Sequence, residues 1–171
     1  DGNVSEIVER IRSTIPLFEP LSAIQLREFM VDSNLRSFSP DENVYERNAY
    51  STEFYAILEG EVEVMEPGSD TDRETDRVES KVSAHRILLG QGAFFGEGSL
   101  ISGRRRSRAV RATAQSVLIE IPRSAMNKLI NTYQDVKDVV NLAFIERKLA
   151  DLLPELGAEQ RREVARSSRE K

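Results

Sequence analysis

Short β-favouring runs separated by turn residues occupy the middle of this chain, from about residue 35 to residue 121. The clearest runs are at 54–57, 62–65, 87–89, 94–95 and 110–121. Many short strands with turns between them are typical of a sandwich, jelly roll or barrel. The residues Glu59-Gly60-Glu61 predict a tight hairpin turn between the first two runs. We therefore expect a mainly β fold, a jelly-roll β-barrel (double-stranded β-helix).

Helical patterns flank this region at both ends. Apolar residues recur at helical spacing over 4–15, and Ser22 is a suitable N-cap for a second short helix. After Pro122 the periodicity predicts helices over 124–131 and 134–153. The last helix carries an apolar seam with a/d spacing, formed by Leu142, Ile145, Leu149 and Leu152. We divide the chain into N-terminal helices at 1–33, a barrel at 34–122, C-terminal helices at 123–153 and a polar, frayed tail at 154–171.

Composition argues against several classes of function. The formal net charge is −5, whereas a domain that binds duplex DNA is normally basic, so we expect no DNA binding by this chain. Cysteine is absent, which excludes a disulfide framework and a zinc–thiolate site. The single histidine, His85, is too few for the several-histidine metal site of a cupin-type enzyme, and we find no catalytic dyad or triad. We therefore expect no enzyme, metal or cofactor.

The chain contains no apolar run of membrane-spanning length and no signal-peptide pattern. We expect a cytoplasmic domain, or the cytosolic part of a membrane protein. Because the chain begins with Asp1 rather than Met, we interpret it as a fragment whose effector domain lies outside it. The segment at 66–84 is charged and almost free of apolar residues, which predicts a long, mobile hairpin loop.

The segment at 94–112 carries the chemistry. It contains the small residues Gly96, Gly98, Ser99, Ser102 and Gly103, and small residues let backbone amides approach a ligand closely. Glu97 stands at its start, and five arginines fall between positions 104 and 111. A carboxylate that accepts from hydroxyls and a guanidinium that pairs with phosphate suit a sugar-phosphate. The alternative from composition alone is a solvated basic loop.

Several motifs, in order and spacing, resemble the cyclic-nucleotide-binding domains of cyclic-AMP receptor proteins, kinase regulatory subunits and cyclic-nucleotide-gated channels. Phe-Gly-Glu at 95–97, Arg106-Ser107 and Val110-Arg111-Ala112 resemble the family's phosphate-binding cassette. The runs at 16–26, 54–64 and 89–97 resemble its opening helix, its strand-turn-strand signature and the approach to the cassette. The resemblance covers about residues 15 to 153 and implies a short cassette helix within the barrel.

The resemblance also implies roles for individual residues. Glu97 would accept from the ribose 2′-hydroxyl, and Arg106 would pair with the cyclic phosphate. The ligand-binding set it implies is Gly96, Glu97, Gly98, Ser99, Leu100, Arg106 and Ser107, with Leu100 packing against the hinge before the last helix. Arg104, Arg105 and Arg108 are interpreted as surface charge. Arg108 stands where the family has a small residue, so we expect it to point outward.

The function implied is a regulatory sensor that binds a cyclic nucleotide and signals through movement of its C-terminal helices. Ser107 stands where cGMP-binding members have Thr, so cAMP is favoured, with cGMP as the alternative. The base would be covered by a residue of the last helix, with Phe144, Ile145, Leu149 and Leu152 as candidates. The seam of that helix allows a homodimer.

We consider two other functions. A receptor-type transcription factor needs a helix-turn-helix domain, and the 18 residues after Leu153 leave no room for one. A degenerate domain that binds no nucleotide would act as a protein-interaction module instead. Such domains typically lose the acid or the arginine of the cassette, and this chain has kept both.

Overall fold

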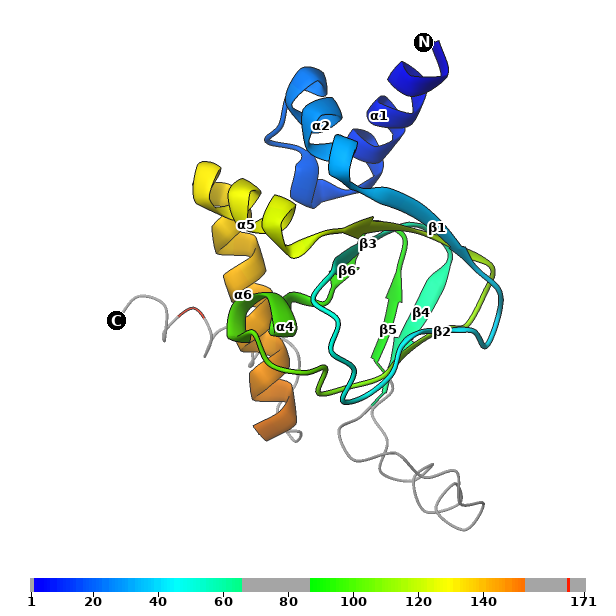
Figure 1. Cartoon of the computed structure of the whole chain (residues 1–171), viewed down its shortest axis with the longest axis vertical. Helices are drawn as coiled ribbons and strands as arrows, with labels where there is room; N and C mark the ends of the chain where they lie inside the picture. Colours follow the sequence, from blue (N-terminus) through cyan, green and yellow to red (C-terminus); the bar gives the residue numbers. More distant parts are fainter. Residues whose placement is uncertain (1, 66–86, 153–165, 167–171) are drawn as a thin grey trace.

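Two four-stranded antiparallel sheets face each other in the computed structural model of this chain, which describes residues 2–65, 87–152 and 166 (Figure 1). One sheet has the strand order β1-β8-β3-β6 and the other β2-β7-β4-β5. The strands are β1 (Asn34–Phe38), β2 (Asn43–Tyr45), β3 (Phe54–Glu59), β4 (Glu61–Val64), β5 (Ile87–Gly90), β6 (Phe94–Phe95), β7 (Val110–Ala112) and β8 (Ser116–Ile121). The predicted jelly-roll architecture is confirmed, as two facing sheets rather than a closed barrel.

Side chains alternate between two cores along the strands that separate them. On β3, Tyr55 and Ile57 face the opposite sheet, whose Val62 and Val110 belong to the same core. Phe54 and its neighbours at alternate positions face the helices instead. Because both faces of β3 are covered, its residues from Phe54 to Leu58 are all buried, and its sequence reads as a continuous apolar run.

The predicted hairpin turn at Gly60 is wrong. β3 and β4 lie in different sheets, so Glu59-Gly60-Glu61 carries the chain from one sheet to the other. Gly60 has φ +94°, and a Cβ there would lie 2.2 Å from the Ser116 Oγ, so the crossing requires glycine. The hairpin partner of β4 is β5, with Val64 opposite Ile87. The predicted loop at 66–84 joins these two strands and lies outside the described residues, as does nearly all of the tail at 154–171.

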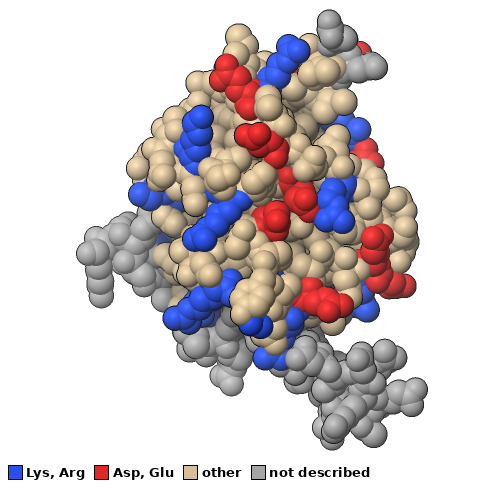
Figure 2. All heavy atoms as spheres, viewed as in Figure 1, with Lys and Arg blue, Asp and Glu red and all other residues tan. Residues whose placement is uncertain are grey.

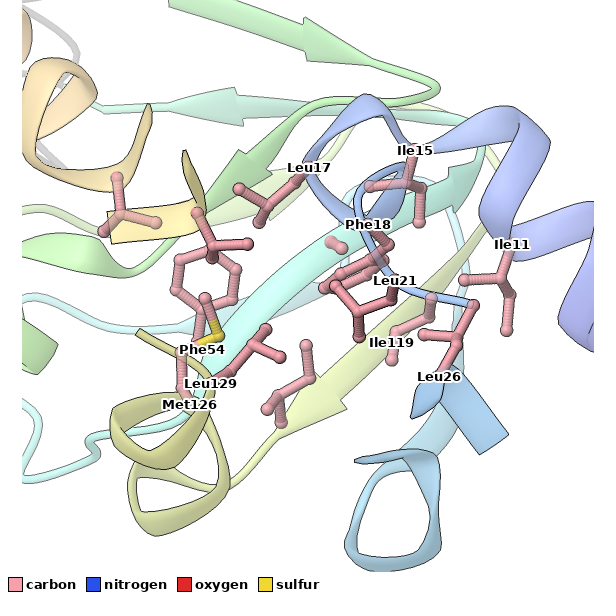
Figure 3. Packing of buried hydrophobic residues seen from close by; sticks show 14 of the residues in the cluster. Ile11, Ile15, Leu17, Phe18, Leu21, Leu26, Phe54, Ile119, Met126 and Leu129 are labelled. Carbon is pink, nitrogen blue, oxygen red and sulfur yellow. The ribbon is translucent and has the colours of Figure 1, made fainter. Parts of the chain in front are cut away.

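The larger core lies between the helices and the outer face of the first sheet (Figure 3). The helical elements before the strands are α1 (Gly2–Thr14), η1 (Pro16–Phe18), α2 (Ala23–Phe29) and η2 (Met30–Asp32). The predicted N-cap of α2 is confirmed as a reciprocal capping box, in which Ser22 Oγ accepts from the Gln25 amide and Gln25 Oε1 accepts from the Ser22 amide. Phe18, Leu26 and Phe54 are fully buried in this core.

In the described part of the chain, one further helix lies within the cassette and two follow it. They are α4 (Glu97–Ser102), α5 (Arg123–Thr132) and α6 (Gln134–Leu152). Val136 and Val140 of α6 are buried against the helical core, so the first half of α6 is fixed by apolar packing. Its second half runs past α4 (Figure 1). Among the described helices, none combines the length and the apolar character needed to cross a membrane.

Candidate ligand pocket

Backbone geometry at Gly96 positions the cassette helix. Gly96 has φ +94° and immediately precedes α4. A Cβ on this residue would lie 2.9 Å from the Glu53 carbonyl oxygen and 3.2 Å from the Arg106 Nη1, so a larger residue would push the helix away from β3. Glycine therefore lets α4 begin against the end of the sheet, with Glu97 as its first residue and Gly103 as its C-cap.

A pocket of about 670 Å³ opens between α4, the segment that follows it and the second half of α6. Six of the seven predicted ligand residues line it: Gly96, Glu97, Gly98, Ser99, Arg106 and Ser107. Leu100 does not. It is 3% exposed and belongs to the helical core, which also contains residues of α5 and α6. The structure thus brings the predicted acid, the predicted arginine and the small residues to one cavity.

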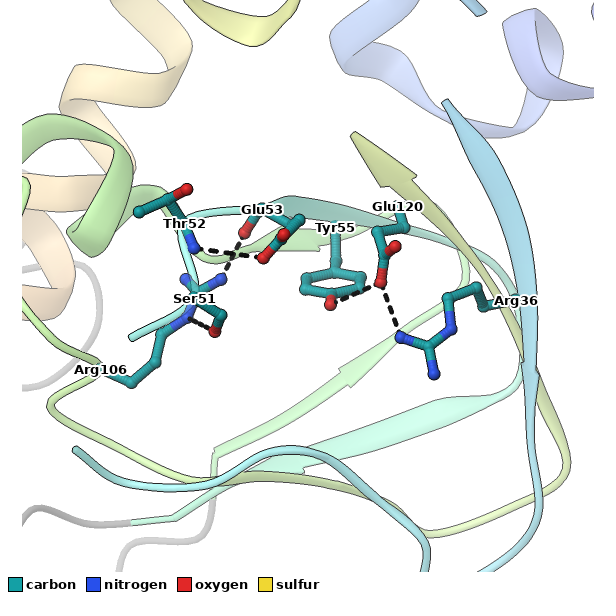
Figure 4. A network of polar contacts seen from close by, with 7 residues as sticks. All are labelled: Arg36, Ser51, Thr52, Glu53, Tyr55, Arg106 and Glu120. Carbon is teal, nitrogen blue, oxygen red and sulfur yellow. Dashed lines mark hydrogen bonds and ion pairs between the residues drawn. The ribbon is translucent and has the colours of Figure 1, made fainter. Parts of the chain in front are cut away.

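Arg106 is buried at the pocket wall, with 2% of its surface exposed. Its Nε donates to the Ser51 hydroxyl at 2.9 Å and its Nη2 to the Glu53 carbonyl at 2.5 Å (Figure 4). Its Nη1 donates to the Gly96 carbonyl at 3.3 Å. The guanidinium lies over the ring of Tyr45, 4.0 Å from its centroid. None of these partners is a carboxylate, so the positive charge is held in place without being neutralised. A guanidinium has five N–H groups, so two remain for a ligand.

Tyr45 contributes the flat face on which this arginine rests. Burial of its ring raises the pKa of Tyr45 to about 12, against the opposing effect of the Arg106 charge. The phenol is therefore neutral under physiological conditions, and its ring supports the cation through the π face. Across the sandwich, 6.0 Å away between ring centroids, Tyr55 donates to Glu120 at 2.8 Å, and Glu120 also accepts from Arg36 (Figure 4). Burial and this hydrogen bond raise the pKa of Tyr55.

Glu97 is also buried, with 4% of its surface exposed, and it is engaged from α6. Arg147 Nη1 donates to Glu97 Oε2 at 2.5 Å, and Arg147 Nη2 donates to the Phe94 carbonyl at 2.7 Å. One side chain of α6 therefore clamps both the first residue of α4 and the end of β6. This ion pair offsets the charge of Glu97 and fixes α6 beside the cassette.

Arg147 is the functional residue that sequence reasoning missed. Of the four predicted lid residues, Phe144 lines the pocket, whereas Ile145 and Leu149 do not, and the side chain of Leu152 lies outside the described set. Arg147 and Lys148 line the pocket beside Phe144. Residues three and four apart share one face of a helix, so the spacing 144, 147, 148 was a signal available in the sequence.

The other arginines of the cassette also reach the pocket. Arg104, Arg105 and Arg108 line it. Arg108, which we expected to point outward, is half-buried on the wall. Arg105 is exposed, and its guanidinium lies over the ring of Tyr50, 3.5 Å from the centroid. Figure 2 shows Lys and Arg side chains gathered at the lower left of the view, over the region of α4 and α6, and Asp and Glu side chains towards the centre and right.

Sequence comparison finds known proteins that are similar to this chain. The profile of the family "Cyclic nucleotide-binding domain" matches residues 35–133. A putative potassium channel protein of Rhodopseudomonas palustris is 28% identical over 127 residues, which are 74% of this chain and 28% of that protein. The cAMP-dependent protein kinase regulatory subunit of Mycosarcoma maydis is 30% identical over 106 residues, 62% of this chain and 18% of that protein. The chain thus spans less than a third of either relative.

The fold has solved counterparts as well. The sensor domain of the transcriptional regulator DNR from Pseudomonas aeruginosa superimposes with a TM-score of 0.66 at 17% sequence identity, over 91% of this chain and 97% of that one. At this level of identity the likeness concerns the fold. It agrees with the two facing sheets and flanking helices described above.

Proposed function

Because this chain belongs to the cyclic nucleotide-binding domain family, we propose that the pocket between α4 and α6 binds a cyclic nucleotide, with cAMP preferred over cGMP. The family consists of regulatory domains rather than catalytic ones, so the chain is a regulatory module. The observation that carries the proposal is the placement of a buried acidic and a buried basic side chain, Glu97 and Arg106, on the wall of one cavity. A buried charge is costly unless it is paired; Arg147 pairs with Glu97, whereas Arg106 has only neutral acceptors among the described residues, and a phosphate would supply its anion.

Arg106 binds the cyclic phosphate in this proposal. Its three existing hydrogen bonds go to neutral acceptors, which fix the guanidinium without neutralising it. The two remaining N–H groups suit a phosphate oxygen, and charge-assisted hydrogen bonds of this kind are about twice as strong as neutral ones. The side chain is already in position before the ligand arrives, so little conformational entropy is lost on binding.

In this proposal, Glu97 accepts a hydrogen bond from the ribose 2′-hydroxyl. Its carboxylate has about four lone-pair sites, so it can hold Arg147 and accept from a sugar hydroxyl as well. Gly98 adds space beside it, because a Cβ at that position would meet no atom within 4 Å. The small residues of α4 thus leave room for the ribose next to the acid.

The base lies on the α6 side of the pocket, where Phe144 offers an aromatic face. Ser107 is exposed on the pocket wall near Arg106, so its hydroxyl does not require a hydrogen bond to a guanine base. One relative is named a cAMP-dependent kinase subunit, which supports cAMP as the ligand. We therefore place cAMP first and cGMP second.

Signalling runs through Arg147. Its contacts with Glu97 and Phe94 tie α6 to the cassette, so a ligand that touches Glu97 changes the contact that holds α6. A ligand shifts such an equilibrium only by its difference in affinity for the two positions of the helix. An effector attached outside this chain would read the position of α6.

Calorimetric titration of the chain with cAMP, cGMP and linear 5′-AMP tests the proposal. We expect saturable binding of cAMP at one site per chain, weaker binding of cGMP, and much weaker binding of 5′-AMP, whose phosphate is not held in a ring. Absence of saturable heat for both cyclic nucleotides would favour the second candidate, a degenerate domain that acts through protein contacts.

A further inference from the structure

Two arginine–tyrosine stacks stand one residue apart in the cassette. Arg106 lies over the half-buried Tyr45 at 4.0 Å, and Arg105 lies over Tyr50, a residue 80% exposed, at 3.5 Å. Tyr45 is the last residue of β2, and Tyr50 lies in the segment that leads from β2 to β3. Stacking on an aromatic face holds a guanidinium in one orientation and leaves its N–H edge available. The outer stack therefore repeats the construction of the inner one at the mouth of the pocket.

The outer arginine has its donors available. Within residues 2–65 and 87–152, the Arg105 side chain makes no hydrogen bond or ion pair besides the contact with Tyr50. Arg104 precedes it, and Lys148 of α6 lines the pocket too; both are exposed and have no carboxylate partner in the same part of the chain. A group of cations on a protein of net charge −5 that finds no acidic neighbour is suited to an external anion.

The charge of the wall exceeds what one cyclic phosphate supplies. Among the described residues of the lining, Glu97 is the single acidic one, and Arg147 already offsets its charge. Arg104, Arg105, Arg106 and Lys148 remain without carboxylate partners in the described part of the chain. A cyclic mononucleotide brings one negative charge, which Arg106 receives. Binding of a mononucleotide alone would leave the outer cations unpaired beside the ligand.

We propose that Arg105, held by Tyr50 and flanked by Arg104 and Lys148, forms a second phosphate subsite at the mouth of the pocket, and that a ligand carrying two phosphates, a cyclic dinucleotide, fills both subsites. The inference rests on the proposed function and defines its ligand class more narrowly. The same chemistry is offered by a free phosphate ion bound beside a cyclic mononucleotide, and the experiment separates the two sources.

A simpler account assigns the outer cations to long-range attraction. Such attraction accelerates association of any anionic ligand, weakens steeply with salt and does not depend on the position of one guanidinium. A subsite predicts more: the loss on removing Arg105 is confined to the ligand with the second phosphate. This difference decides the design of the test.

The experiment titrates the chain with cAMP, with cyclic di-AMP, and with cAMP in the presence of inorganic phosphate, all at 150 mM salt. In the parent chain we expect cyclic di-AMP to bind at least tenfold more tightly than cAMP. Arg105→Ala should lower its affinity about 10- to 100-fold, the loss of a charge-assisted contact, and change that of cAMP less than threefold. Tyr50→Leu keeps the charge, removes the stack and should give an intermediate loss for cyclic di-AMP.

Arg27→Ala is the matched control, because Arg27 is an exposed arginine on α2 outside the pocket lining. It should leave both affinities unchanged. If inorganic phosphate tightens cAMP binding in the parent but not in Arg105→Ala, the subsite is supported and a free ion is its source. If cAMP binds and neither second phosphate improves binding, the subsite is refuted while the proposed function stands. If no nucleotide binds, both are refuted.

Discussion

The two arginine–tyrosine stacks of the cassette have similar geometry and opposite surroundings. Arg106 is 2% exposed and donates to three acceptors from the segment that ends in β3 and from Gly96, whereas Arg105 is exposed and rests on Tyr50 alone. The inner arginine therefore belongs to the fold as much as to the ligand. The described contact of Arg105 is the exposed ring of Tyr50, so we expect little contribution from Arg105 to the stability of the fold. Arg106 thus carries a buried charge held by protein contacts, whereas Arg105 carries a charge that is exposed to solvent.

The difference follows from local backbone contacts. Backbone hydrogen bonds join the Arg106 amide to the Ala49 carbonyl and the Asn48 amide to the Arg106 carbonyl. These bonds fix the inner position against the β2–β3 connection and direct its side chain into the pocket wall. Arg105, one residue earlier, is left on the outside of the same turn of chain. Neighbouring arginines in a basic run can thus have unrelated functions.

Removal of the inner arginine should have the largest effect. Arg106→Ala removes the proposed phosphate contact and the hydrogen bonds that Arg106 donates to the carbonyls of Glu53 and Gly96. We expect cAMP affinity to fall at least 10- to 100-fold and the free energy of unfolding to fall by about 1–3 kcal/mol. Calorimetry and urea unfolding measure the two effects. Unchanged affinity in a folded variant would remove Arg106 from the site.

Glu97→Gln tests the ribose contact next. The amide keeps the size of the side chain but loses the charge, so we expect cAMP affinity to fall about tenfold, within the range of a hydrogen bond to a charged group. The ligand 2′-deoxy-cAMP lacks the hydroxyl and provides the control in competition binding. Its affinity should change much less. An equal loss for both ligands would mean that Glu97 acts on the fold rather than on the ribose.

Arg147→Ala tests the clamp on α6. The variant leaves the buried Glu97 without its cation and frees the second half of α6 from β6, although part of Arg147 is exposed and solvent screens the pair. We expect faster amide hydrogen exchange in residues 141–150, with little change in 134–140, which is fixed by Val136 and Val140. Uniform acceleration along the helix would contradict a local clamp.

The inner tyrosine should also make stability depend on alkaline pH. The pKa of Tyr45 is about 12 in the folded chain and about 10 when unfolded, so the folded state holds the proton more tightly. Its stabilising contribution is complete below pH 10 and is lost as pH rises through about 12. Tyr45→Phe should reduce the loss of stability over this interval, measured by urea unfolding at each pH. The pKa of Tyr55 is also raised, and this residue is unchanged in the variant, so part of the pH dependence of stability should remain.

The smallest effect belongs to the outer arginine. Arg105→Ala removes an exposed side chain whose described contact is the ring of Tyr50. We expect the free energy of unfolding to stay within about 0.5 kcal/mol of the parent value, as for most surface substitutions. A thermal or urea unfolding curve beside that of Arg106→Ala shows the contrast. A destabilisation comparable to that of Arg106→Ala would end the distinction between the two stacks.

Sequence patterns predicted the elements of this fold well where the signal is local. The capping box of Ser22, the helices after Pro122 and the short strands all depend on neighbouring residues, and the structure has them. The crossing at Gly60 was misread as a hairpin, because a tight glycine turn between two β runs does not reveal whether they pair with each other. The clash with Ser116 that requires glycine there comes from 56 residues away in the sequence.

The site shows the same limit. Glu97 and Arg106 follow from a motif of contiguous residues, and the structure places both on the pocket. The helical spacing of Arg147 with Phe144 and Lys148 is visible in the sequence, but its contact with Glu97 is not, since that partner lies 50 residues earlier. The tyrosines beneath the two arginines come from the end of β2 and from the β2–β3 connection, and no sequence pattern links them to the cassette. Contacts between distant segments needed the three-dimensional arrangement.

A crystal structure of the chain with cAMP tests the central claim most directly. The account predicts density for the nucleotide between α4 and α6, with a phosphate oxygen about 3 Å from a nitrogen of Arg106 and the ribose 2′-oxygen about 3 Å from the Glu97 carboxylate. A nucleotide bound elsewhere, or one that fills this pocket with its phosphate away from Arg106, would contradict it.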